Sequence, residues 1–305
     1  SFTGHCMMMV LKLWNNYAGN ILLHLKTLGG LLMKNWVKKV AGVMALCIFA
    51  TAMAGCAGTK KETAVDALKK KGKIVVGTAT GYYPFEMADK NGKLVGYDID
   101  VAKALGKELG VEVEFQNYAF SGLIPALQAK KVDVVIAGMT ITDKRKEVVD
   151  FSDSYFTSGQ AMLVNKNYPN VKKWEDLDKP GNVIAVSMGT TADQTATKMF
   201  KNAEVKKFEG SALAGLELLN GNAVAVIHEV PWVAIYNKMH DDKTYAVLEP
   251  FTTEELGIAV PKGNPELVAE INKFVKKYKA SEDYKKTHDY WFVDMKWWDM
   301  VPAKK

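Results

Sequence analysis

The hydrophobic positions of this chain alternate between two patterns from residue 73 onward. Short β-branched runs, typical of buried strands, occupy 73–78, 111–115, 132–137, 183–187 and 223–227. Stretches with apolar residues three and four apart, typical of helices, occupy 97–109, 123–130, 191–200, 211–219 and 230–238. Strands and helices that alternate at this spacing predict parallel α/β layers.

The alternation stops near 150–180 and then restarts, which predicts two lobes. The stretches 160–165 and 254–260 have the pattern of extended segments that cross between the lobes as a hinge. Ligands of open α/β sheets bind beyond the carboxyl ends of the strands, so the expected site is the cleft between the lobes. We assign lobe 1 to 73–159 and 261–305, with C-terminal helices at 265–280 and 281–290, and the hinge segments with lobe 2 to 160–260.

The N-terminal region follows a different pattern. Met33 is followed by three lysines and then by a mainly apolar run of 15 residues at 40–54. This run is shorter than the ~20 residues that span a bilayer, and the whole pattern predicts an export signal over 33–55. Met53–Cys56 is similar to a bacterial lipobox, which predicts a lipid on Cys56 and a membrane-anchored tether over 56–72. An uncleaved anchor or a plain secretory signal is the alternative, and each of these places the body outside the cytoplasm.

Residues 1–32 contain no acidic residue. Gly29 and Gly30 lie just before Met33, at the spacing at which an in-frame ribosome-binding site would be translated as Gly-Gly. We therefore interpret 1–32 as upstream sequence that a gene prediction has read through, with translation starting at Met33.

The composition is that of a globular protein of up to two domains, with 305 residues, 48% hydrophobic and 24% charged. The net charge is +6, but residues 1–55 hold five lysines and no acid, so the rest has 35 basic and 34 acidic residues. A body so close to neutral has no general basic face, and we expect no nucleic-acid partner. Cys6 and Cys47 lie in the leader, which leaves Cys56. We therefore expect no disulfide and no cysteine metal cluster, and we predict no metal site and no cofactor.

Three segments carry a resemblance to a known family: GYYPFEMADKNGKLVGYDIDVAKALGKELG (81–110), FSGLIPALQAKKVDVVIAGMTITDKRKEVVDFSDSYFTSGQ (120–160) and VSMGTTAD (186–193). The chain resembles, over 72–295, the family 3 extracellular solute-binding proteins, which are amino-acid receptors of ABC importers. The resemblance implies an α/β, bilobed type II periplasmic-binding-protein fold, with two mixed, mostly parallel sheets flanked by helices and a two-segment hinge. It also implies a monomer that closes on a free L-amino acid and delivers it to ABC permease and ATPase subunits.

The carboxylate of an amino acid needs a matched partner in a dry site. Arg145 is the single arginine among 39 lysines, and a guanidinium binds a carboxylate in a bidentate way that an ammonium cannot. The resemblance places Arg145 at the family's carboxylate-binding arginine; a solvated surface charge is the alternative. Thr190 and Thr191, with Gly189, precede a helix whose N-terminus favours an anion. An ordinary helix cap there is compatible with that role.

The resemblance assigns the ammonium to Gly138, Thr140 and Glu229. Gly138 and Thr140 supply a carbonyl and a hydroxyl, with Met139 between them near the pocket. Glu229 stands where the family usually has Asp, so the charge is kept and one methylene is added. His228 beside it either lines the pocket or is a hydrogen-bonded core residue.

The ligand's side chain is expected between the rings of Tyr82 and Phe120, which match the family's aromatic positions. Relatives that bind cations often carry an acid at the position of Ala79, and Ser121 replaces a common Asp. Ala79 and Ser121, with Met139 and Ala192 nearby, favour a neutral side chain, although Glu86 remains able to serve a cation.

The main rival is an enzyme on the same fold, a dehydratase-like protein that uses a desolvated acid on a small carboxylate. Glu229 beside His228 is the candidate general acid. The sequence shows no nucleophile triad, metal-ligand spacing or GxGxxG loop, so we expect a receptor and not an enzyme. A sensory ligand-binding domain is the other alternative.

Overall fold

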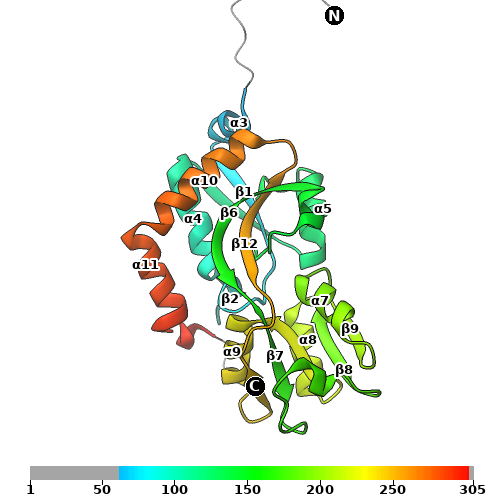
Figure 1. Cartoon of the computed structure of the whole chain (residues 1–305). Helices are drawn as coiled ribbons and strands as arrows, with labels where there is room; N and C mark the ends of the chain where they lie inside the picture. The colour runs from blue at the N-terminus through cyan, green and yellow to red at the C-terminus, as the bar shows by residue number, and fades with distance from the viewer. Residues whose placement is uncertain (1–61, 302–305) are drawn as a thin grey trace, which may run out of the picture. The chain divides into compact units, whose positions relative to one another are not determined.

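The computed structural model describes residues 62–301 (Figure 1). The predictions for 1–32, for the export signal at 33–55 and for lipidation of Cys56 lie outside the described residues. The described residues form two five-stranded sheets, one in each lobe. No helix among residues 62–301 is long and apolar enough to cross a membrane.

The sheet of the first lobe contains, in order, β4 (Glu112–Asn117), β1 (Lys73–Thr78), β5 (Val134–Val135), β12 (Glu254–Pro261) and β6 (Val149–Ser158). β1 is parallel to β4 and β5, whereas β12 is antiparallel to β5 and β6. Four strands therefore share one direction and β12 opposes them.

The sheet of the second lobe contains, in order, β11 (Thr244–Val247), β7 (Gln160–Asn165), β10 (Ala225–Glu229), β8 (Val183–Ser187) and β9 (Glu204–Phe208). β8 is parallel to β9 and β10, and β7 is antiparallel to β10 and β11. Here β7 is the one reversed strand. The predicted fold class, with two mixed and mostly parallel sheets flanked by helices, is confirmed.

Helices cover both faces of each sheet because successive side chains of a strand point to opposite faces. In β1, Ile74 and Val76 are buried in the core that α4 and α10 share, whereas Val75 joins the core of α5. In β8, Ala185 is buried in the core of α8 and α9, and its neighbours in that of α7. These helices are α4 (Tyr97–Leu109), α5 (Leu123–Gln128), α7 (Thr191–Met199), α8 (Ser211–Leu219), α9 (Val230–Met239) and α10 (Pro265–Lys279).

The shorter elements lie mainly on the first lobe. Thr63 caps α3, which buries Leu68 and packs against α10, so this part of the expected tether belongs to the folded body. The aromatic C-terminal segment buries Trp291 and Trp297, and the ammonium of Lys238 in α9 lies 4.4 Å from the ring centre of Trp298. The short elements are α3 (Ala64–Lys71), β2 (Met87–Ala88), β3 (Leu94–Val95), α6 (Asp143–Lys146), α11 (Glu282–His288) and the single turns at Phe120–Gly122, Trp174–Leu177, Asp289–Val293 and Trp298–Met300.

The chain crosses between the sheets twice, at Gly159 between β6 and β7 and through 248–253 between β11 and β12. Figure 1 shows β6 and β12 side by side as they approach the second lobe. The two segments that were expected to cross are themselves strands, β7 of the second sheet and β12 of the first. The crossings are bonded to each other, because Gln160 N donates to Thr252 Oγ1 (2.9 Å) and Phe251 N to Gln160 O (3.0 Å).

Gly159→Ala is expected to destabilise the protein by about 1–3 kcal/mol, because extra atoms in a packed site force backbone shifts. A Cβ on Gly159 would lie 2.4 Å from the carbonyl oxygen of Thr252 and 2.7 Å from Pro250 Cβ. Urea unfolding followed by circular dichroism measures the effect. Gly122→Ala is the control, because its Cβ would meet nothing closer than Tyr118 at 3.9 Å. Equal unfolding free energies for the two variants would contradict the expectation.

Candidate ligand-binding site

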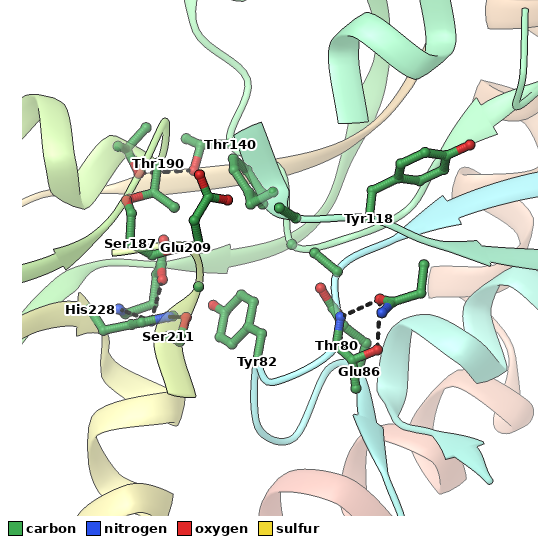
Figure 2. A pocket seen from close by; sticks show the side chains of 18 of the residues that line it. Thr80, Tyr82, Glu86, Tyr118, Thr140, Ser187, Thr190, Glu209, Ser211 and His228 are labelled. Carbon is green, nitrogen blue, oxygen red and sulfur yellow. Dashed lines mark hydrogen bonds and ion pairs between the residues drawn. The ribbon is translucent and has the colours of Figure 1, made fainter. Parts of the chain in front are cut away.

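A cavity of about 230 Å³ lies between the two lobes (Figure 2). Its wall follows the carboxyl ends of β1, β4, β5, β8, β9 and β10, where the sites of parallel sheets lie. The first lobe contributes Ala79, Thr80, Tyr82, Glu86, Asn117, Tyr118, Ala119, Phe120, Gly138, Thr140 and Arg145. The second lobe contributes Ser187, Thr190, Thr191, Glu209, Gly210, Ser211, His228 and Glu229.

Arg145 is 5% exposed and joins the two lobes. Its Nη1 donates to the carbonyl of Thr140 (2.7 Å), and its Nη2 donates across the cleft to the carbonyl of Gly189 (3.1 Å). Its Cζ lies 5.2 Å from the ring centre of Phe120. Burial lowers the pKa of Arg145 to about 10, so the guanidinium is charged at neutral pH. Two of its five N–H donors have protein acceptors, which leaves three for an anion.

Gly138 sits at a turn that a larger residue would block. Its φ is +54°, and a Cβ there would lie 2.3 Å from Cε1 of Tyr82. Its N–H donates to Asp98 Oδ2 (2.6 Å), and this hydrogen bond to α4 fixes the position of the turn. The ring of Tyr82 can therefore lie against the turn and line the cavity.

The N-terminus of α7 faces the cavity through Thr191. Thr190 caps the helix, because its Oγ1 accepts from Asp193 N (3.1 Å). The backbone N–H groups of Gly189 and Thr190, expected to be free, donate instead to Asp193 Oδ2 (3.0 Å) and to the carbonyl of Ser187 (3.4 Å). Thr191 is the first helical residue, so its N–H has no acceptor within the helix. The N–H of Thr191 is therefore a donor available to an anion at this end.

Glu229 is 5% exposed and is held by neighbours on its own lobe. His228 Nδ1 lies 2.7 Å from its Oε2, and Gln160 Nε2 donates to its Oε1 (3.1 Å). Burial raises the pKa of Glu229, but the charge and hydrogen bond of His228 lower it more, so the pKa lies below its ordinary value. Its ionised form therefore adds stability above the ordinary carboxyl pKa, and this stability is lost as the pH falls through the lower value of the folded state.

His228 satisfies both readings of the sequence, because it is 4% exposed and also lines the cavity. Its Nε2 lies 2.7 Å from Ser211 Oγ, and its ring stacks on Trp232 with centres 4.5 Å apart. Its Nδ1 lies 2.7 Å from Glu229 Oε2 and also 2.8 Å from the backbone N of Glu229, which donates to it. The imidazole is thereby fixed as part of the wall.

The structure brings together most of the residues that the sequence predicts for the site. Met139 is the exception, because it is fully buried in the core of α5 and does not line the cavity. The predicted residues in the wall are Tyr82, Phe120, Gly138, Thr140, Arg145, Thr190, Thr191 and Glu229. Sequence reasoning missed Thr80, Asn117, Tyr118, Ala119, Ser187, Glu209, Gly210 and Ser211, although each lies at or just after the end of a strand. Within residues 62–301, no three His, Cys, Asp or Glu side chains are grouped to hold a metal ion.

Residues 74–294 match the family model described as bacterial extracellular solute-binding proteins, family 3. The chain is 34% identical to the probable histidine-binding protein of Neisseria gonorrhoeae, over 86% of this chain and 96% of that protein. It is also 34% identical to the ABC transporter glutamine-binding protein GlnH of Bacillus subtilis, over 85% of this chain and 98% of that protein.

Solved structures show the same likeness. The crystal structure of the ancestral amino acid-binding protein AncCDT-1, a precursor of cyclohexadienyl dehydratase, matches with a TM-score of 0.70 and 44% sequence identity. The match covers 75% of this chain and 99% of that one. Nearly the whole of that structure therefore has a counterpart here.

Proposed function

The chain belongs to the bacterial extracellular solute-binding proteins of family 3, and from this premise we propose that it is the receptor of an ABC importer for a free amino acid. The two lobes enclose the ligand and offer it to the membrane permease, which works with ATPase subunits. Membership of an extracellular family places the body outside the cytoplasm.

One observation carries this proposal: a buried guanidinium and a buried carboxylate, from different lobes, line one small cavity. Arg145 of the first lobe keeps three N–H donors for the ligand's carboxylate, and Thr191 of the second lobe adds a helix N-terminus. Glu229 of the second lobe is the partner for the ammonium. Because the contacts come from both lobes, a bound amino acid favours the closed arrangement.

We propose further that the mature chain is a monomer, anchored through a lipid on Cys56. The relatives named for transport support the receptor role over catalysis, and we propose that the chain is not an enzyme. Because one similar structure is that of a precursor of a dehydratase, an activity assay should test Glu229 as the candidate general acid. Conversion of a small carboxylate that Glu229→Gln abolishes, with ligand binding retained, would support the enzyme.

The neutral side chain predicted for the ligand rests on four positions. The cavity wall includes Ala79, but Ser121, Met139 and Ala192 are not part of it. Three of the four positions therefore do not contact a ligand in this cavity, and the preference must be argued from the carboxyl groups that do line it.

A thermal-shift screen of the full chain against the twenty amino acids tests the function. A ligand that binds only the folded state, present at about 100 times its Kd, adds about 2.7 kcal/mol of stability. We expect one amino acid, or a small set with similar side chains, to stand clear of the rest. A panel without any stabilising amino acid would contradict the proposal.

A further inference from the structure

Glu86 lines the cavity, and the one hydrogen-bond partner of its side chain among the described residues is another carboxyl group, that of Asp98. It lies in the loop between β1 and β2, is 0% exposed, and no N–H or hydroxyl donor in the described part of the chain reaches its carboxyl oxygens. Figure 2 shows it beside Thr80 in the wall of the cavity. Buried polar atoms are nearly always paired, so a buried carboxyl group in a cavity wall that meets only another carboxyl group indicates a donor on the ligand.

The surroundings of Glu86 add negative charge and no cation. Asp98 shares a hydrogen bond with it, and Asp98 Oδ2 also accepts from Gly138 N (2.6 Å) and from the hydroxyl of Tyr155 (2.9 Å). The other titratable groups that act on Glu86 are Glu229 and Tyr82. Burial and the charge of Asp98 raise the pKa of Glu86 well above its ordinary value. These effects favour the protonated form of Glu86, in which it donates to Asp98.

The charge balance of the cavity indicates which ligand completes it. Arg145 and Glu229 oppose the two charges that every amino acid carries. Glu209 is exposed at the wall, where water screens it. Glu86 and Asp98 then remain as a buried pair of carboxyl groups to which an amino acid with a neutral side chain brings no cation.

We propose that Glu86 binds the side-chain cation of the ligand, so that the cavity selects arginine-like amino acids over their neutral isosteres; this inference rests on the proposed function. A guanidinium presents two parallel N–H groups that match the two oxygens of an ionised carboxylate such as that of Glu86. When the cation enters, Glu86 ionises and its proton passes to the solvent, so a cation and a neutral acid become an ion pair and a released proton.

Calorimetric titration of the full chain with L-arginine and L-citrulline tests this inference. Citrulline has the size of arginine but a neutral side chain, so it keeps every contact except the ion pair. We expect arginine to bind about 100-fold more tightly, the effect of one buried charge pair. Repeating the titration in buffers of different ionisation enthalpy should show about one proton released with arginine and none with citrulline.

Glu86→Gln should lower the affinity for arginine about 100-fold and change that for citrulline less than threefold. Glu112→Gln, which changes an exposed carboxylate of β4 outside the cavity, is the control and should change neither. If Glu86→Gln fails to fold, the comparison of the two ligands and the proton count on the unmodified chain still decide.

Equal affinity of the unmodified chain for arginine and citrulline would overturn the inference. A Glu86→Gln variant that weakens both ligands equally would also overturn it, because Glu86 would then serve the α-ammonium or the fold. If neutral amino acids bind and arginine does not, the inference fails while the proposed function stands. If no amino acid binds, both fail.

Discussion

Arg145→Lys is expected to lower the affinity for the amino acid at least about 100-fold while the fold is retained. The guanidinium holds the Thr140 and Gly189 carbonyls with two of its donors and keeps three for the ligand's carboxylate. An ammonium has three donors in all and cannot bind a carboxylate in the bidentate way. Hydrogen bonds to charged groups contribute about 1.5–3 kcal/mol each, so losing two lowers affinity by two orders of magnitude or more.

Calorimetry on the best ligand of the thermal-shift screen measures this loss, and circular dichroism checks the fold. Lys144→Ala is the matched control, because Lys144 is exposed on the same short helix, α6, and does not line the cavity. Unchanged affinity in Arg145→Lys would mean that the carboxylate binds elsewhere. Equal losses in the two variants would point to the helix and not to the guanidinium.

The fold was predictable from sequence wherever strands are buried on both faces. The helices α4 and α8 and the strands β1 and β8 begin and end where the pattern predicts. In the two five-stranded sheets the pattern missed β6, β9 and β11, and all three lie at an edge; it also missed β2 and β3, which pair only with each other. An edge strand is half exposed and tolerates charge, as Glu204 and Lys206 in β9 illustrate. Its sequence therefore resembles a loop, which is why 150–158 was assigned to the pause between lobes.

Site residues were predictable from sequence where the residue type is rare in the chain or stands at a characteristic position between a strand and a helix. Arg145 stands out because it is the single arginine, and Thr191 because it begins a helix after a strand. Glu86 gives no such signal, because an acid next to an aromatic residue is usually solvated. It is buried by the segment that follows it: Asp98 N donates to the carbonyl of Phe85 (2.9 Å), which brings α4 against the loop. Contacts between segments of this kind cannot be inferred from local pattern.

The same limit applies to Glu229, whose neighbours come from elements apart in sequence. Gln160 in β7 donates to its Oε1, and the hydroxyl of Ser211 in α8 fixes His228, which contacts its Oε2. Both oxygens therefore have a partner before a ligand enters. The carboxylate stays ionised, as its lowered pKa indicates, and its position is fixed for the ammonium.

Glu229→Gln is accordingly expected to lower the affinity for the amino acid at least about 100-fold, because removing one member of a buried ion pair costs about 3–5 kcal/mol. Glu229→Asp keeps the charge and is expected to preserve or improve binding, since the family usually has Asp at this position. Calorimetry on both variants measures the difference. If both bind as the unmodified chain does, Glu229 does not meet the ammonium. If Glu229→Gln and Glu229→Asp lose affinity equally, the charge of Glu229 does not determine binding. A residue that pairs with the ammonium must bind better as a carboxylate than as an amide, so equal losses would indicate an effect of side-chain size.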